Sequence, residues 1–190
     1  MRALANWSGA IAGLLLILTG GLIQAGLPSV GPAGLSVIPL PITLQVPALL
    51  LTALVCGPRS AMLAGVAYLS LGLIELPVFH GGGGVAYLQD PGFGYLAGFL
   101  PAAWVSGRLA RQPGMDQLLN LTAAALVGLG VLQLCGLANL LLGALVGRWG
   151  GALPQLLVSY SLGPLIPQLL LCCAVAVLAL PLRRLLLVES

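Results

Sequence analysis

Apolar residues fill most of this chain, and they fall into runs separated by short segments rich in glycine, proline, arginine and aspartate. The runs approach 20 residues and lack the alternation of apolar and polar positions that marks a half-buried strand. In lipid, a single segment of this kind satisfies its backbone groups only as an α-helix. The pattern therefore predicts six helical spans, at residues 7–25, 44–56, 60–76, 91–109, 118–146 and 167–182.

Three of the connecting segments are long and rich in glycine and proline, at 26–43, 76–92 and 147–163. Residues 26–47 include five prolines, so no regular helix is expected there. Irregular apolar backbone is tolerated at membrane depth only under cover of protein, so we expect this segment to fold back over the bundle. The span that follows, 44–56, is about 20 Å long and needs that cover to complete the passage through about 30 Å of hydrocarbon.

The composition places the protein in the membrane. Hydrophobic residues make up 59% of the sequence and charged residues 6%, with a mean hydropathy of +1.11. One soluble core does not need this much apolar surface. The sequence thus predicts an all-α integral membrane protein with a single transmembrane domain at 1–190. A cleaved signal peptide remains the alternative interpretation of the first span.

Arginine supplies every basic side chain, because the chain has no lysine. This excludes a P-loop lysine and a Schiff-base lysine, so the chain does not hydrolyse ATP by the Walker route. The cysteines and the one histidine have no zinc-site spacing, and no metal or cofactor is expected. Six of the seven arginines fall on the side of the N-terminus: Arg2, Arg59, Arg108, Arg111, Arg183 and Arg184. The positive-inside rule then predicts cytoplasmic N and C termini in the cell membrane, with the three long loops outside.

The segment 71–99 concentrates polarity in an otherwise apolar chain. It contains the histidine, a run of four glycines that includes Gly82 and Gly83, and aromatic residues that include Phe79 and Tyr95. Glycines lack a Cβ atom, so a ligand or another backbone segment can approach them closely. A slack surface loop is the alternative interpretation.

Aromatic residues also gather in or beside the other outer loops, as Tyr160 does. Three unusual loops on one side favour a pocket that they build together, open to the outside. Thr43 and Gln45 begin the short second span and are expected to face this pocket, although helix capping by Thr43 explains its presence equally well.

Small residues follow one face of the first span, where Ser8, Gly9, Ala12 and Gly13 stand four apart in two pairs. Such strips allow close contact between helices. The contact is either packing inside the bundle or docking to another membrane protein, and the sequence leaves both open.

Several segments carry a specific resemblance: PLPITLQ at 39–45, GPR at 57–59, YLSLGLIELPVF at 68–79 with the glycine run behind it, and GYLAGF at 94–99. Their order and spacing resemble the BioY family, the biotin-binding S components of energy-coupling-factor (ECF) transporters. The resemblance implies an S-component bundle that binds biotin at the external face and is no enzyme. It also implies as partners a transmembrane T component, which contacts the small-residue face of the first helix, and two ATP-binding subunits. No nucleic acid is expected.

The resemblance weakens in the last outer loop. There the family usually carries an aspartate and a lysine that contribute to ligand recognition, whereas this chain has Pro164 and Pro167. Neutral groups and one cation are left as candidates, and Arg148 with the start of the last helix is predicted to hold the ligand carboxylate. The candidate substrate-binding residues are Thr43, Gln45, Phe79, Gly82, Gly83, Tyr95, Arg148, Tyr160 and Gln168, with Ser159 as a further neutral candidate.

Two alternatives remain at this point. An S component for another vitamin is compatible with the altered last loop. An intramembrane enzyme is the other, although His80 lies in a loop beside the glycines and not at a matched depth on a helix facing a serine.

Overall fold

The computed structural model describes residues 2–31, 34–74, 76–79 and 82–186, so His80 and Gly81 lie outside the described residues. It confirms a helical membrane bundle with six main helical segments. The helices are α1 (Arg2–Leu22), α2 (Gln45–Cys56), α3 (Pro58–Leu73), α4 (Phe93–Ala97), α5 (Phe99–Leu109), α6 (Leu118–Leu145), α7 (Leu153–Leu157) and α8 (Gly163–Leu185). Only Gly98 separates α4 from α5.

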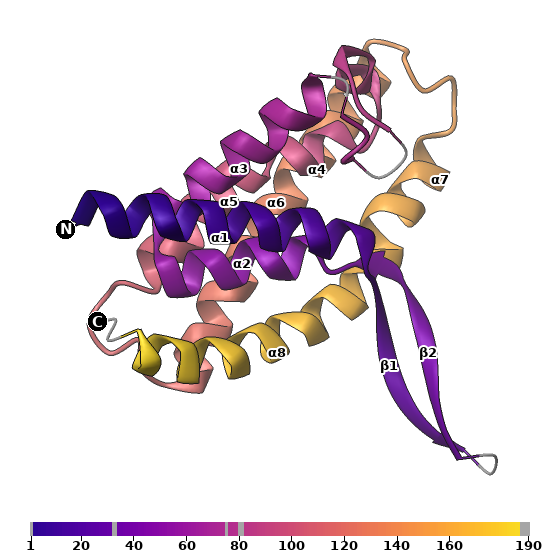
Figure 1. Cartoon of the computed structure of the whole chain (residues 1–190). Helices are drawn as coiled ribbons and strands as arrows, with labels where there is room; N and C mark the ends of the chain where they lie inside the picture. The colour runs from indigo at the N-terminus through magenta and orange to yellow at the C-terminus, as the bar shows by residue number, and fades with distance from the viewer. Residues whose placement is uncertain (1, 32–33, 75, 80–81, 187–190) are drawn as a thin grey trace.

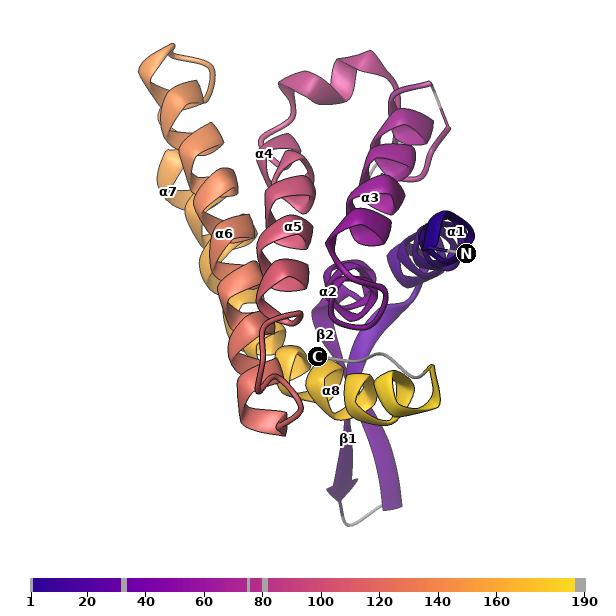
Figure 2. The ribbon, with the colours of Figure 1, turned by 90° about the vertical axis from the view of Figure 1, so that its left-hand side faces the viewer.

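Three helical segments are long and apolar enough to cross a membrane without help: Ala3–Leu22, Leu118–Leu145 and Leu153–Leu185. The short helix α2 instead lies in the middle of the bundle, packed against α1, α3, α5 and α8 (Figure 2). Gly57 ends α2 with a φ of 89°, and Pro58 opens α3 at its first turn. A helix of 12 residues is stable here because its neighbours cover it on all sides.

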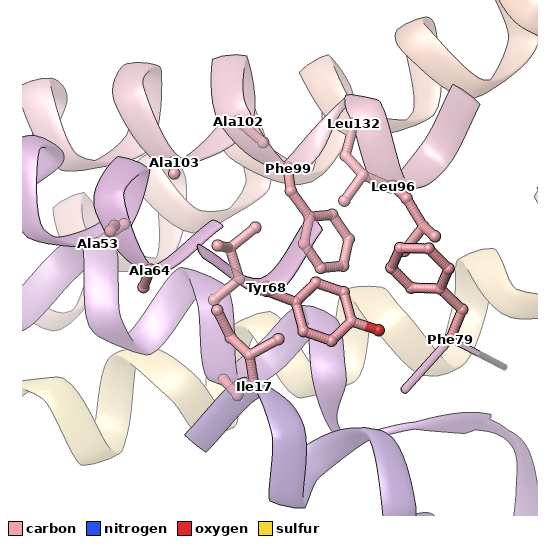
Figure 3. Close-up of a cluster of buried hydrophobic side chains, with 13 residues drawn as sticks. Ile17, Ala53, Ala64, Tyr68, Phe79, Leu96, Phe99, Ala102, Ala103 and Leu132 are labelled. Carbon is pink, nitrogen blue, oxygen red and sulfur yellow. The ribbon is translucent and has the colours of Figure 1, made fainter. Parts of the chain in front are cut away.

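The hydrophobic core beside the candidate site contains aromatic side chains. Figure 3 shows the rings of Tyr68 and Phe99 lying between Ile17 on one side and Leu132 on the other. Tyr68 and Phe99 are almost completely buried, and their ring centroids are 6.0 Å apart. This packing joins α1, α3, α5 and α6 at one level of the bundle.

Residues 24–43 form a two-stranded antiparallel hairpin of β1 (Gln24–Gly31) and β2 (Gly34–Thr43). The absence of a helix was predicted correctly, but the predicted fold back over the bundle was wrong. Figure 1 shows the hairpin projecting away from the helices. Its inward-facing backbone groups pair across the two strands, so the bundle does not have to cover those groups. Prolines are compatible with it because both strands are edge strands.

The last span starts earlier than predicted. A continuous helical segment runs from Leu153 to Leu185, with a π-helical turn at Val158–Leu162 between α7 and α8. Proline removes one backbone hydrogen bond from a helix interior, and a widened π turn is a common way to accommodate such a break. Pro164 and Pro167 therefore lie inside the helical segment and do not mark its start.

Candidate functional site

A cavity of about 1020 Å³ opens at the end of the bundle where the hairpin leaves it. Its walls come from the end of α1, the last residues of β2, the first turn of α2, residues 77–79, α4, α6, the π turn and α8. All three long loops or their helical continuations contribute residues. This agrees with the prediction of a jointly built pocket.

Most of the candidate residues meet at this cavity. The lining includes Thr43, Gln45, Phe79, Tyr95, Tyr160, Gln168 and Ser159. The structure shows no side-chain cap at the start of α2, so the alternative explanation of Thr43 as a cap is not supported. Pro164 also lines the cavity, while Pro167 is buried beside it in α8.

The described glycines of the run, Gly82 to Gly84, shape the wall and do not themselves line this cavity. Gly82 forms an isolated β-bridge with Phe79, and the amide of Gly84 donates to the carbonyl of Gly72 at 2.7 Å. A Cβ atom on Gly83 would collide with the carbonyl of Leu76. Close approach of backbone to these glycines was predicted, and here the approaching backbone is that of α3 and the segment after it. Gly82 and Gly83 line a smaller adjoining hollow of about 400 Å³.

Phe79 is fixed from three sides. Its ring covers Gly72, where an added Cβ would lie inside the ring. Its centroid lies 5.5 Å from that of Tyr68 in an edge-to-face arrangement and 4.8 Å from that of Tyr87. The Tyr68 hydroxyl donates to the carbonyl of Val78 at 2.8 Å, which ties the same segment to α3. The cavity therefore has a rigid apolar wall.

A second aromatic wall lies on the opposite side. The Tyr95 ring rests on Gly136 of α6, where it leaves no room for a Cβ atom. Its hydroxyl hydrogen-bonds to Ser161 in the π turn, and its ring stacks on that of Tyr160 with centroids 6.1 Å apart. The widened turn thus places Tyr160 and Ser161 against α4.

Amide side chains provide the buried polar groups. Gln45 is 8% exposed, and its Nε2 has no hydrogen-bond partner among the described residues. Tyr68 lies beside Gln45: its hydroxyl donates its hydrogen to the carbonyl of Val78, and its oxygen lies near the Gln45 amide without a hydrogen bond of good geometry. On the other side, Gln133 of α6 donates from Nε2 to Oε1 of Gln168 at 2.9 Å. Gln133 is 8% exposed and its own Oε1 has no partner in the described part of the chain.

The described lining of the cavity has no side chain with a formal charge, and tyrosine is its only titratable type. Burial, with Asp90 and Tyr160 nearby, raises the pKa of Tyr87 to about 12. This phenol is therefore protonated at neutral pH. The described lining therefore offers a ligand neutral donors, neutral acceptors and aromatic faces.

Arg148 was predicted to hold a carboxylate, but the structure does not bring it to the cavity. It is exposed in the connection between α6 and α7 and does not line the cavity. The ring of its neighbour Trp149 packs on Gly143, and the indole donates to the carbonyl of Leu140 at 2.8 Å. These contacts direct the connection onto α6. The start of the last helical segment at Leu153 is also outside the lining.

The small-residue strip of α1 divides into two faces. Gly9 and Gly13 are buried, and Cβ atoms on them would meet Cys56 and Thr52 of α2. Packing inside the bundle accounts for these two glycines. Ser8 and Ala12 are exposed on the outer face of α1, so they remain available to a partner.

Residues in or beside the site that sequence reasoning did not single out include Tyr68, Phe99 and Gln133. The two aromatic residues appear in sequence as ordinary core residues. Gln133 did give a signal, because it is a polar residue in the middle of the apolar span 118–146, and such residues are often functional.

Comparison with known proteins identifies the family of this chain. A sequence profile described as "BioY family" matches residues 9–187. The chain belongs to the BioY family. A probable biotin transporter BioY of Lysinibacillus sphaericus is 37% identical over 95 residues, covering 48% of each chain. The biotin transporter BioY of Thermotoga maritima is 38% identical over 99 residues, covering 52% of this chain and 57% of that one.

These alignments span about half the length of the curated BioY relatives. A crystal structure of the S-component for biotin from an ECF-type ABC transporter matches with a TM-score of 0.73 and 20% identity, over 96% of this chain and 93% of that chain. That similarity establishes the BioY-like fold across the whole bundle. The family consists of transporter components and not of enzymes.

Proposed function

We propose that this chain binds biotin in the cavity and imports it as the S component of an ECF-type transporter in the cell membrane. The whole chain, 1–190, acts as one substrate-binding domain. A separate T component and two ATP-binding subunits supply the energy. The observation that carries the proposal is the cavity itself, built jointly by the hairpin, the glycine-rich segment and the π turn in a member of the BioY family.

The chemistry of the lining suits this ligand. Biotin combines an apolar bicycle and chain with a ureido group and a carboxylate. Phe79, Tyr95 and Phe99 offer apolar faces. The side-chain amides of Gln45 and Gln168 offer hydrogen bonds to the ureido group. Because the described lining has no cation, the carboxylate belongs at the open end of the cavity, where water solvates it.

Ligand titration tests the proposal. The purified chain should bind biotin, and it should bind the other vitamins of a panel weakly or not at all. Thr43→Trp places an indole at the cavity wall and should abolish binding, whereas Leu141→Trp, at an exposed position of α6 outside the cavity, should not. Failure to bind biotin, or preference for another vitamin, would refute the proposed substrate.

For the orientation we propose cytoplasmic termini and an external cavity. The supporting observation is that the start of α1 and the end of α8 lie at the end of the bundle away from the hairpin (Figure 1). In a background without the native cysteines, Gly150→Cys should react with an impermeant thiol reagent from outside and Gln112→Cys should not. Both positions are exposed, so the opposite pattern would invert the topology.

For the T component we propose docking on the exposed face of α1. Ser8 and Ala12 lie there beside the exposed side chains of Ile11 and Leu15. Small residues between larger ones allow a second helix to approach closely. Cross-linking of an Ala12→Cys variant to the T component in membranes tests this contact, with the lipid-facing Leu141→Cys as the control.

A further inference from the structure

The cavity has two side-chain amides on different walls, a buried one at Gln45 and a half-buried one at Gln168. Gln45 comes from the first turn of α2 and Gln168 from α8, and these two helices pack against each other. The Nε2 of Gln45 has no hydrogen-bond partner among the residues that the structure describes. A buried donor left unpaired is costly, so a group of this kind in a ligand cavity indicates that the ligand supplies the acceptor.

Gln133 fixes the direction of the second amide. Its Nε2 donates to Oε1 of Gln168, which orients the Gln168 amide with its oxygen toward Gln133. The remaining polar atom of the Gln168 side chain, Nε2, is then the one left for the cavity. Gln133 itself does not line the cavity. It therefore acts on the ligand only by positioning Gln168.

Two neutral donors on different walls suit an uncharged acceptor with two lone pairs. A ureido carbonyl oxygen has this chemistry. A carboxylate suits the site less well, because no cation lines the described cavity and burial of an uncompensated charge costs far more than burial of a carbonyl group.

We infer that Gln45 and Gln168 donate hydrogen bonds to the ureido oxygen of the ligand, and that Gln133 is the positioning residue for Gln168. This inference rests on the proposed biotin binding and assigns its specificity. The ureido ring then lies at the amides of Gln45 and Gln168, between the aromatic walls of Phe79 and Tyr95. The carboxylate points toward the opening.

The test compares biotin with its 2-thio analogue, in which a weakly accepting sulfur replaces the ureido oxygen. The unsubstituted chain should prefer biotin. Gln45→Met and Gln168→Met keep the side-chain length but remove the donor, and each should weaken biotin about 5- to 100-fold. Neither variant should weaken the thio analogue as much, so the preference for oxygen should collapse.

Gln133→Met should also reduce the preference for oxygen, by less than Gln168→Met. Its thermal unfolding without ligand should be unchanged or raised, because a buried acceptor without a partner is removed. A merely structural role predicts the reverse, with lowered stability and an unchanged preference. The same change at Gln155, which is exposed on α7 and outside the cavity, serves as the control.

Four outcomes would overturn the inference. Equal losses of affinity for biotin and for its thio analogue would mean that these donors do not bind the ureido oxygen. If Gln168→Met instead abolished discrimination against biotin that is methylated on a ureido nitrogen, the Gln168 oxygen would be the atom that contacts the ligand, as acceptor from that N–H group. If the unsubstituted chain binds no biotin, the proposed function fails and this assignment fails with it, whereas normal binding by all variants refutes the assignment alone.

Discussion

The added methyl group of a Gly72→Ala substitution tests whether the cavity wall depends on the contact between α3 and Phe79. The added Cβ atom would overlap three atoms of the Phe79 ring, so the ring has to move. Phe79 exchanges two backbone hydrogen bonds with Gly82, and the Gly84 amide donates to Gly72, so the backbone that carries the ring is held against α3. Overpacking of this kind costs about 1–3 kcal/mol.

The expected result is a loss of stability together with a loss of ligand affinity. A cost of about 1–3 kcal/mol lowers the thermal midpoint of a chain of this size by about 2–12 °C. Phe79 lines the cavity, so its displacement should weaken biotin binding as well. Thermal unfolding of the detergent-solubilised chain, with and without biotin, measures both effects.

A matched control lies two helical turns away on the same face of α3. Gly65→Ala makes the same substitution where the new Cβ would meet Leu100 at 3.8 Å and Leu49 at 4.0 Å, which are ordinary contacts. It should be neutral or stabilising by up to about 1 kcal/mol, because alanine favours a helix more than glycine does. In the Gly72→Ala background, Phe79→Leu should restore part of the stability. Equal effects of the two alanines, or no coupling between residues 72 and 79, would refute the reasoning.

Three further predictions concern other parts of the molecule. Gly13→Leu should destabilise the isolated chain by more than about 2 kcal/mol because its side chain enters the contact with α2, whereas Ala12→Leu should leave thermal unfolding unchanged. Arg183→Met should lower the thermal midpoint more than Arg184→Met. Arg183 is 3% exposed and donates to two backbone carbonyls, at 2.8 and 3.2 Å, whereas Arg184 is exposed. Equal midpoints of the two variants would contradict this prediction. Biotin affinity should vary less than about threefold between pH 6 and pH 9, because tyrosine is the only titratable type in the described lining and the pKa of Tyr87 is about 12.

Much of the architecture followed from the sequence. The length and spacing of the apolar runs predicted a helical membrane bundle, and proline correctly excluded a helix from residues 26–43. Burial of these patterns in lipid leaves the backbone few choices, so periodicity and composition were sufficient. The predicted pocket between the outer loops followed from the unusual composition of those loops.

The tertiary structure decided what the local pattern could not. Prolines near Pro164 predicted a loop, but the membrane favours a helix with a π turn over an uncovered irregular chain. The hairpin at 24–43 depends on pairing between strands, which no single apolar run reveals.

The site shows the same division. The sequence named Gln45 and Gln168 as candidates because their residue types suit hydrogen bonding, and it named Arg148 because of its charge. Which groups meet depends on the packing of α2, α6 and α8, which brings Gln133 to Gln168 across 35 positions of sequence and leaves Arg148 outside. Composition and periodicity fix which surfaces each helix buries, whereas the partner that each buried polar atom finds is set only when the helices pack.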